Sequence, residues 1–260
     1  MEFIQQLING LALGSVYALL ALGYTMVYGI IQLINFAHGE IYMIGAFAGF
    51  YSATTLKLPL IPTLLVAMAV SSLAGIIIEK IAYKPLRNSP RITLLITAIG
   101  VSLLLQNSMR ILVGSDPKPF PDLINAGALN IGAVQIQWKT ILMFLVSALL
   151  VIVLQFIVYK TKLGKAMRAA SQDIEAASLM GINVNNTISF TFALGSALAG
   201  IAGVLVAISY PSITPYIGVM PGLKSFVAAV LGGIGSIPGA LVGGLLIGIL
   251  ETLSKAYIST

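Results

Sequence analysis

Residues 140–159 read TILMFLVSALLVIVLQFIVY, and residues 160–186 read KTKLGKAMRAASQDIEAASLMGINVNN. The first stretch has no charged residue and has the length of a helix that crosses the hydrocarbon layer of a bilayer, about 20 residues. The second stretch is polar and opens with four cations, Lys160, Lys162, Lys165 and Arg168. This abrupt change predicts a membrane-spanning helix that ends in a basic loop on one side of the membrane.

The composition of the whole chain points the same way. Of its 260 residues, 58% are hydrophobic and only 8% are charged, whereas soluble domains carry about 25% charged residues. Helices satisfy their own backbone hydrogen bonds in lipid, and the 26 glycines suit close helix packing. The sequence therefore predicts an all-α, polytopic transmembrane helical bundle. The net charge of +6 lies in loops that flank the membrane, so no nucleic-acid partner is expected.

Apolar stretches predict about eight membrane segments, including short and broken helices. They cover residues 7–28, 41–56, 63–81, 92–113, 140–159, 187–210, 223–231 and 240–257. Residues 223–231 are too few to cross a bilayer alone. We expect residues 1–260 to form a single transmembrane domain.

Two basic loops fix the orientation of the bundle. One lies near residues 80–91 and the other begins at residue 160, and two predicted segments separate them. Because each segment changes sides, both loops lie on the same side, which the excess of Lys and Arg makes cytoplasmic.

The loop at residues 114–138 is then external. Alternating apolar residues at 129–136 predict a small hairpin there. This loop is either a docking surface for an external partner or a lid over the protein's own helices. The N-terminus is predicted outside. Residue 260 is also outside if residues 223–239 reach the inner face, and inside if they form a re-entrant segment.

Residues 171–181, within the cytoplasmic loop 160–186, predict a short capped helix. Ser171 or Asp173 is suited to the N-cap, Glu175 to the positive end of the helix dipole, and Gly181 to the position after the helix. We interpret this helix as a docking element for a cytoplasmic partner; the alternative is an interfacial helix that anionic lipid attracts. The predicted coupling residues are Ser171, Asp173, Ile174, Glu175, Ala176, Ala177 and Gly181.

Several long motifs carry a family resemblance. Glu175-Ala-Ala, followed by Gly181, resembles the EAA loop of ABC importer permeases. LINFAHGE at 33–40, GINVNNTISFTFALGSALAGIAGVL at 181–205 and SYPSITPYIGVMPGLKSFVAAVLGGIGSIPGALVGG at 209–244 are similar to the branched-chain amino acid ABC transporter permease family, the LivH-type inner-membrane subunit. The resemblance covers most of the chain. Members of that family usually continue into a further hydrophobic C-terminal segment, which is absent from these 260 residues.

The resemblance implies a multi-pass subunit of the bacterial cytoplasmic (inner) membrane. It implies a related permease as partner, in a homo- or heterodimer, together with two cytoplasmic ATPases and a periplasmic or extracellular substrate-binding protein. The expected function is import of branched-chain or other hydrophobic amino acids by alternating access. The chain lacks a GxxxxGK[ST] motif, so it is not expected to be an enzyme or to hold a cofactor, and ATP and Mg would bind the ATPases.

Two polar interruptions, LINFAHGE and GGIGSIPG at 232–239, are candidate pathway or hinge elements, since ionisable groups and helix breaks within a membrane are often functional. The alternatives are helix caps for Asn35 and His38, a backbone turn at Gly39, and a tight turn for GGIGSIPG. The candidate pathway or hinge residues are Asn35, His38, Gly39, Glu40, Gly233, Gly235 and Pro238.

Two other function classes fit the residues less well. A secondary transporter or channel not driven by ATP would need coupling-ion ligands, for which His38 and Glu40 are few. One His, no Cys and no HExxH motif predict neither a catalytic nor a metal site.

Overall fold

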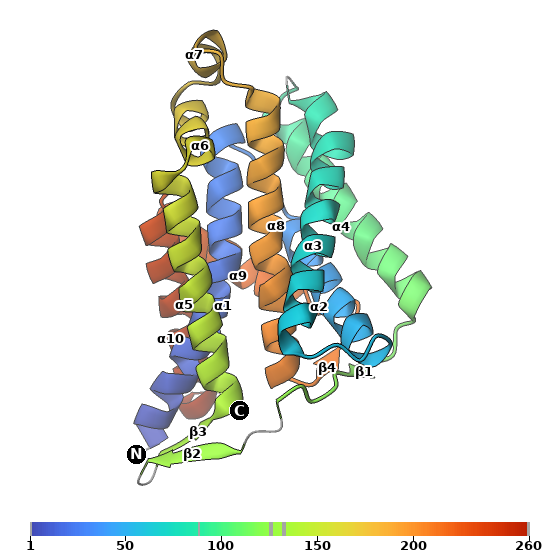
Figure 1. Cartoon of the computed structure of the whole chain (residues 1–260), viewed down its shortest axis with the longest axis vertical. Helices are drawn as coiled ribbons and strands as arrows, with labels where there is room; N and C mark the ends of the chain where they lie inside the picture. The colour runs from blue at the N-terminus through green and yellow to red at the C-terminus, as the bar shows by residue number, and fades with distance from the viewer. Residues whose placement is uncertain (1, 88, 125–126, 132–133, 259–260) are drawn as a thin grey trace.

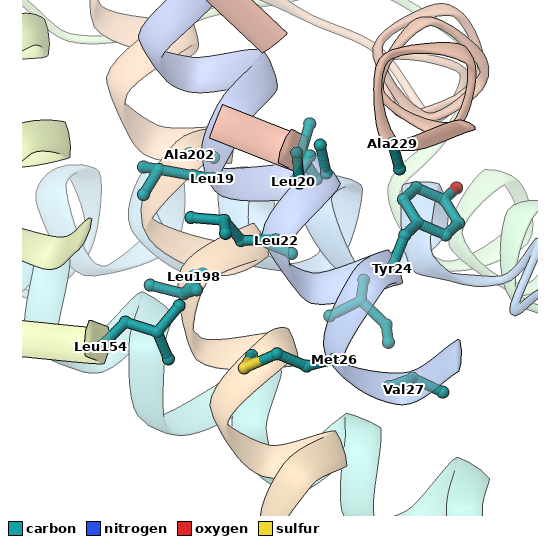
Figure 2. Close-up of a cluster of buried hydrophobic side chains, with 14 of the residues drawn as sticks. Leu19, Leu20, Leu22, Tyr24, Met26, Val27, Leu154, Leu198, Ala202 and Ala229 are labelled. Carbon is teal, nitrogen blue, oxygen red and sulfur yellow. The ribbon is translucent and has the colours of Figure 1, made fainter. Parts of the chain in front are cut away.

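The computed structural model describes residues 2–87, 89–124, 127–131 and 134–258. Two helices, α1 (Glu2–Ile31) and α8 (Val184–Ser209), form the centre of a helical bundle and are buried over most of their length (Figure 1). The surrounding helices are α2 (His38–Thr54), α3 (Leu60–Ile78), α4 (Arg91–Val113), α5 (Trp138–Lys160), α9 (Val219–Leu231) and α10 (Ile237–Tyr257). Leucines and alanines of α1, α5 and α8 belong to one buried apolar cluster, among them Leu19, Leu154 and Leu198 (Figure 2).

The prediction of an all-α membrane bundle is confirmed. Among the described residues, six helices are long and apolar enough to cross a membrane, and the shorter α2 and α9 complete the eight segments. The first helix begins earlier than predicted, at Glu2 rather than Leu7. Its first turns tolerate polar side chains because Gln5, Gln6 and Asn9 face an outer cavity of about 910 Å³ instead of lipid.

Glycines allow the helices of the bundle to touch along their backbones. α1 and α10 run antiparallel, with Gly10 against Ile249 and Gly14 against Leu245 and Gly248. A Cβ atom added to Gly248 would lie 2.2 Å from the Gly14 Cα atom. These spacings follow the small-xxx-small pattern of membrane helices, and within this chain they join its first and last helices.

The charge pattern predicts that the end of the bundle with the basic segments is cytoplasmic and the opposite end external, and the two ends are named accordingly. α6 (Lys162–Gln172) and α7 (Ile174–Leu179) lie at one end, and both chain termini lie at the other (Figure 1). The turn after α9 also reaches the α6 end, where Gly235 and Ile237 share a cavity of about 80 Å³ with Arg168. Residues 223–239 therefore complete a crossing, and α10 returns the chain to the external end.

Two short sheets cover the external end. β2 (Ala128–Ile131) and β3 (Val134–Gln137) pair antiparallel and form the predicted hairpin. β1 (Lys118–Pro119) pairs with β4 (Ser212–Ile213), so the loop before α5 is attached to the segment after α8. A hydrogen bond from Lys139, at 3.1 Å, lowers the pKa of the exposed Asp122 beside the hairpin.

Candidate functional site

The cytoplasmic segment folds as two helices rather than one. α6 contains three of the four cations predicted to lie in a loop, and it buries Gly164, Met167 and Ala170 against the bundle. Arg168 donates to the Val158 carbonyl and lies over the Tyr159 ring. One apolar stripe between the cations suffices to dock such a helix on the bundle.

α7 has the caps expected from its sequence, with one correction. Asp173 Oδ1 accepts hydrogen bonds from the Glu175 and Ala176 amides at 2.8 and 2.9 Å. Ser171 is not a cap; it lies inside α6, and its hydroxyl donates to the Arg168 carbonyl. Gly181 has φ +83°, the left-handed conformation that suits glycine after a helix.

α7 contacts the rest of the chain through one side. Ala177 is its only fully buried residue. Glu175 and Ala176 are exposed, as is Ile174 at the start of the helix. Leu179 and Met180, at its tip, are 89% and 83% exposed, so apolar side chains project beyond the cytoplasmic end of the bundle. Such a patch is typical of a surface that another protein covers.

A buried ion pair, which the sequence did not suggest, joins α3 and α8 at this end of the bundle. Glu79 is completely buried at the end of α3, in a π-helical turn over Glu79–Tyr83. It accepts hydrogen bonds from Arg87 and, at 2.6 Å, from the Ser189 hydroxyl. Arg87 also donates to the Asn185 side chain at 2.7 Å. The cytoplasmic ends of α3 and α8 are thus fixed to each other.

The first polar interruption, residues 33–40, folds back into the bundle. The side-chain oxygen of Asn35 accepts from the Ala37 amide at 3.1 Å and from the Tyr83 hydroxyl at 2.6 Å. Asn35 therefore holds the break in place and links it to the π-helical turn. His38 packs against Gly23 of α1, about 12 Å along the helix from the end of α1, so α2 begins well inside the bundle.

The first turn of α2 contains three consecutive buried residues, His38, Gly39 and Glu40. Gly39 lies within the first turn of α2, so the alternative of a backbone turn at this glycine does not hold. A Cβ atom there would lie 2.6 Å from the Gly218 carbonyl oxygen at the start of α9. The His38 ring packs edge-on against Tyr24, with centroids 4.8 Å apart. Glu40 accepts one hydrogen bond, from Ser102 of α4 at 3.2 Å.

The second polar interruption, residues 232–239, corresponds to the tight-turn alternative. Gly233 and Gly235 have φ values of +87° and +97°. Ser236 caps α10, and Pro238 lies in the first turn of that helix. Gly233, Gly235 and Pro238 are exposed at the cytoplasmic end, so they do not break a helix within the membrane.

A second ionic cluster joins three helices in the outer half of the bundle. Glu251 of α10 accepts from Lys255 at 2.5 Å, from Lys224 of α9 at 2.6 Å and from the Tyr17 hydroxyl of α1 at 2.8 Å. The i, i+4 spacing of Glu251 and Lys255 on α10 favours their pairing. The contributions of Lys224 and Tyr17 depend on tertiary packing.

The external hairpin is fixed to α1 by the Gln5 side chain, which donates to the Gln135 carbonyl at 2.7 Å and accepts from the Gln135 amide at 3.0 Å. We expect Gln5→Ala to loosen the hairpin by about 1–2 kcal/mol and to speed its cleavage by an added protease. Gln6→Ala is the matched control, since Gln6 lines the same cavity. Equal cleavage of the two variants would contradict this role of Gln5.

Comparison with known proteins gives the family. The profile described as the branched-chain amino acid transport system / permease component matches residues 6–260. The branched-chain amino acid permease LivH of Salmonella typhimurium is 46% identical over 270 residues, which cover 99% of this chain and 88% of the relative. LivH of Escherichia coli strain K12 is 47% identical with the same coverage. BraD of Pseudomonas aeruginosa is 46% identical over 96% of this chain and 85% of the relative.

The match includes every membrane segment from α1 to α10 and both polar interruptions. The chain therefore belongs to the family of branched-chain amino acid transport permease components.

Proposed function

We propose that this chain is the permease subunit of an ABC importer for branched-chain or other hydrophobic amino acids in the bacterial cytoplasmic membrane. The observation that carries the proposal is a capped helix, α7, held beyond the basic end of a membrane bundle that belongs to this family. A related permease completes the membrane part, in a homo- or heterodimer. An external substrate-binding protein delivers the amino acid, and the chain itself is not an enzyme.

The energy source is assigned to separate chains. Two cytoplasmic ATPases bind ATP and Mg and dock on α7, where Ile174, Leu179 and Met180 offer apolar contacts. Movement of the ATPases is transmitted through α6, whose buried face packs on the bundle. The Glu79–Arg87 pair keeps the neighbouring helix ends together, so a displacement of α7 reaches α3 and α8 as a unit.

Uptake by purified, reconstituted complexes tests this function. The subunit and its co-purifying chains are placed in proteoliposomes with ATP inside and the binding protein outside. We expect accumulation of leucine, isoleucine or valine that requires ATP hydrolysis. Uptake that persists without ATP would favour the alternative, a secondary transporter or channel.

Docking on α7 is tested with a matched pair of substitutions. Met180→Asp should reduce co-purification of the ATPases by about tenfold or more, as expected when a central apolar contact becomes charged. Ile258→Asp is the control, because Ile258 is also 83% exposed but directly follows α10, which leads away from the α7 end of the bundle. An equal recovery of ATPase with both variants would mean that α7 is not the docking element.

A further inference from the structure

Two helices that cover only part of the membrane begin at the same place inside the bundle. α2 runs from there to the external end, parallel to α8, whereas α9 runs to the cytoplasmic end, antiparallel to α10. Their first turns touch: a Cβ atom on Gly222 of α9 would lie 2.9 Å from the Gly39 Cα atom of α2. Opposed part-helices of this kind surround substrate sites in several transporter folds.

Glu40, in the first turn of α2, is the chemically exceptional residue at this junction. Only 2% of it is exposed. Its Oε1 atom has the single hydrogen bond from Ser102, and its Oε2 atom has none. No ion pair among the described residues involves Glu40. A buried carboxyl group with a free oxygen is costly in a membrane, and such a residue is functional by default.

Another polar atom at the junction also has no partner in the described part of the chain. Ser225 Oγ on α9 is buried and forms no hydrogen bond. Ser225 lies one helical turn from Gly222, on the buried face of α9. The positive ends of the α2 and α9 dipoles meet here, which favours an anionic group at the junction.

The remaining wall of the junction is aromatic. Tyr24 packs against Phe226 with centroids 6.0 Å apart, and Phe226 packs against Phe36 at 5.6 Å. The hydroxyl of Tyr24 lies 3.5 Å from where a Gly222 Cβ atom would be. These rings are apolar, so the junction combines an acid, two dipole ends and aromatic side chains. This is the chemistry that recognises a zwitterionic, aliphatic amino acid.

α4, the helix that covers Glu40, is the least buried of the spanning helices. Of the described residues of α4, only Leu94 and Ala98 are fully buried. Gly100, near the middle of α4, has no atom within 4 Å of its Cβ position, unlike the glycines of α1, α2, α8 and α10. Moving α4 away from α2 would uncover Glu40 and leave the α1–α8 core in place.

We infer that Glu40 binds the α-ammonium group of the transported amino acid at an intermediate point of the pathway, which α4 uncovers when it moves away from α2. The inference rests on the proposed function and adds a site to it. Charge pairing replaces the water lost by the ammonium group, and the Tyr24–Phe226 surface receives the side chain.

Carboxyl labelling of the wild-type complex tests the site directly. The importer, in proteoliposomes with its partner chains, is treated with dicyclohexylcarbodiimide during ATP turnover, and labelled peptides are quantified by mass spectrometry. Leucine should reduce labelling of Glu40 by roughly tenfold, whereas 4-methylpentanoate, which lacks the ammonium group, should not. Labelling of Glu251, which three donors occupy, serves as the control. Equal labelling of Glu40 with and without leucine, or equal protection by both compounds, would overturn the inference.

Two variants extend the test to transport. Glu40→Gln should lower ATP-driven leucine uptake by roughly tenfold or more, the loss expected without a charge-assisted hydrogen bond, while ATP hydrolysis persists. Glu40→Asp should restore most of the uptake. Unchanged uptake by Glu40→Gln would reject this site but leave the proposed function standing, whereas absent ATP-driven uptake by the wild type would reject the function itself. If Glu40→Gln fails to assemble, the labelling result on the wild type decides.

Discussion

Gly248→Ala is expected to destabilise the bundle by about 3 kcal/mol or more, because its new methyl group cannot fit between α10 and α1. The added Cβ atom would lie 2.2 Å from both the Cα and the amide nitrogen of Gly14 and 2.7 Å from the Gly10 carbonyl oxygen. These are backbone atoms, so no rotamer change relieves the overlap and the two helices must separate. Thermal unfolding in mild detergent and the yield of monodisperse protein measure the effect.

Gly100→Ala is the matched control, since it makes the same substitution inside another spanning helix. Nothing lies within 4 Å of the Gly100 Cβ position, so the unfolding temperature of the isolated subunit should stay unchanged or rise slightly with helix propensity. If both variants unfold at the wild-type temperature, the close contact of α1 and α10 does not limit stability.

Glu79→Ala is expected to cost about 3–5 kcal/mol, because it leaves Arg87 without its buried counter-charge. The side chain of Glu79 is completely buried and that of Arg87 is 18% exposed, so water replaces the lost carboxylate poorly. The Ser189 hydroxyl loses its acceptor as well. The free energy of unfolding, followed in detergent with increasing denaturant, measures the loss.

Two further variants separate the buried charge from its surroundings. Glu79→Ala combined with Arg87→Ala should recover part of the loss, since the uncompensated cation is then removed. Asp122→Ala removes the exposed external ion pair with Lys139 and should cost less than about 1 kcal/mol. A Glu79→Ala variant as stable as Asp122→Ala would show that the pair does not brace α3 and α8.

Hydropathy predicted the membrane segments because each must be apolar over the thickness of the bilayer. It was least accurate where a helix does not face lipid. α1 begins at Glu2 because its polar first turns line the outer cavity. α6 does not stand out in hydropathy averages, because its docked stripe lies between cations. Caps are local, so Asp173 and Gly181 were predicted correctly around α7.

Contacts between side chains on different helices could not be predicted from the sequence. The Glu79–Arg87 pair is close in the chain, but its extension to Asn185 and Ser189 requires α3 and α8 to pack together. Gly39 illustrates the same limit. From the sequence, a turn was one alternative for this glycine. In the structure, the absence of a side chain at Gly39 allows α2 to contact α9. The predicted roles of Asn35, His38 and Glu40 as pathway or hinge residues remain predictions, now with defined neighbours.

The contact of the first helix with the last has a consequence for biosynthesis. The Tyr17–Glu251 hydrogen bond joins residues 234 positions apart, and Gly10 and Gly14 of α1 pack against α10. During translation α1 enters the membrane long before α8 and α10 exist. Its packing surfaces, including Gly10 and Gly14, must remain exposed to lipid or to an insertion chaperone until α10 has been made. Chains halted before α10 would then be substrates for membrane quality control, because this face of α1 is left uncovered.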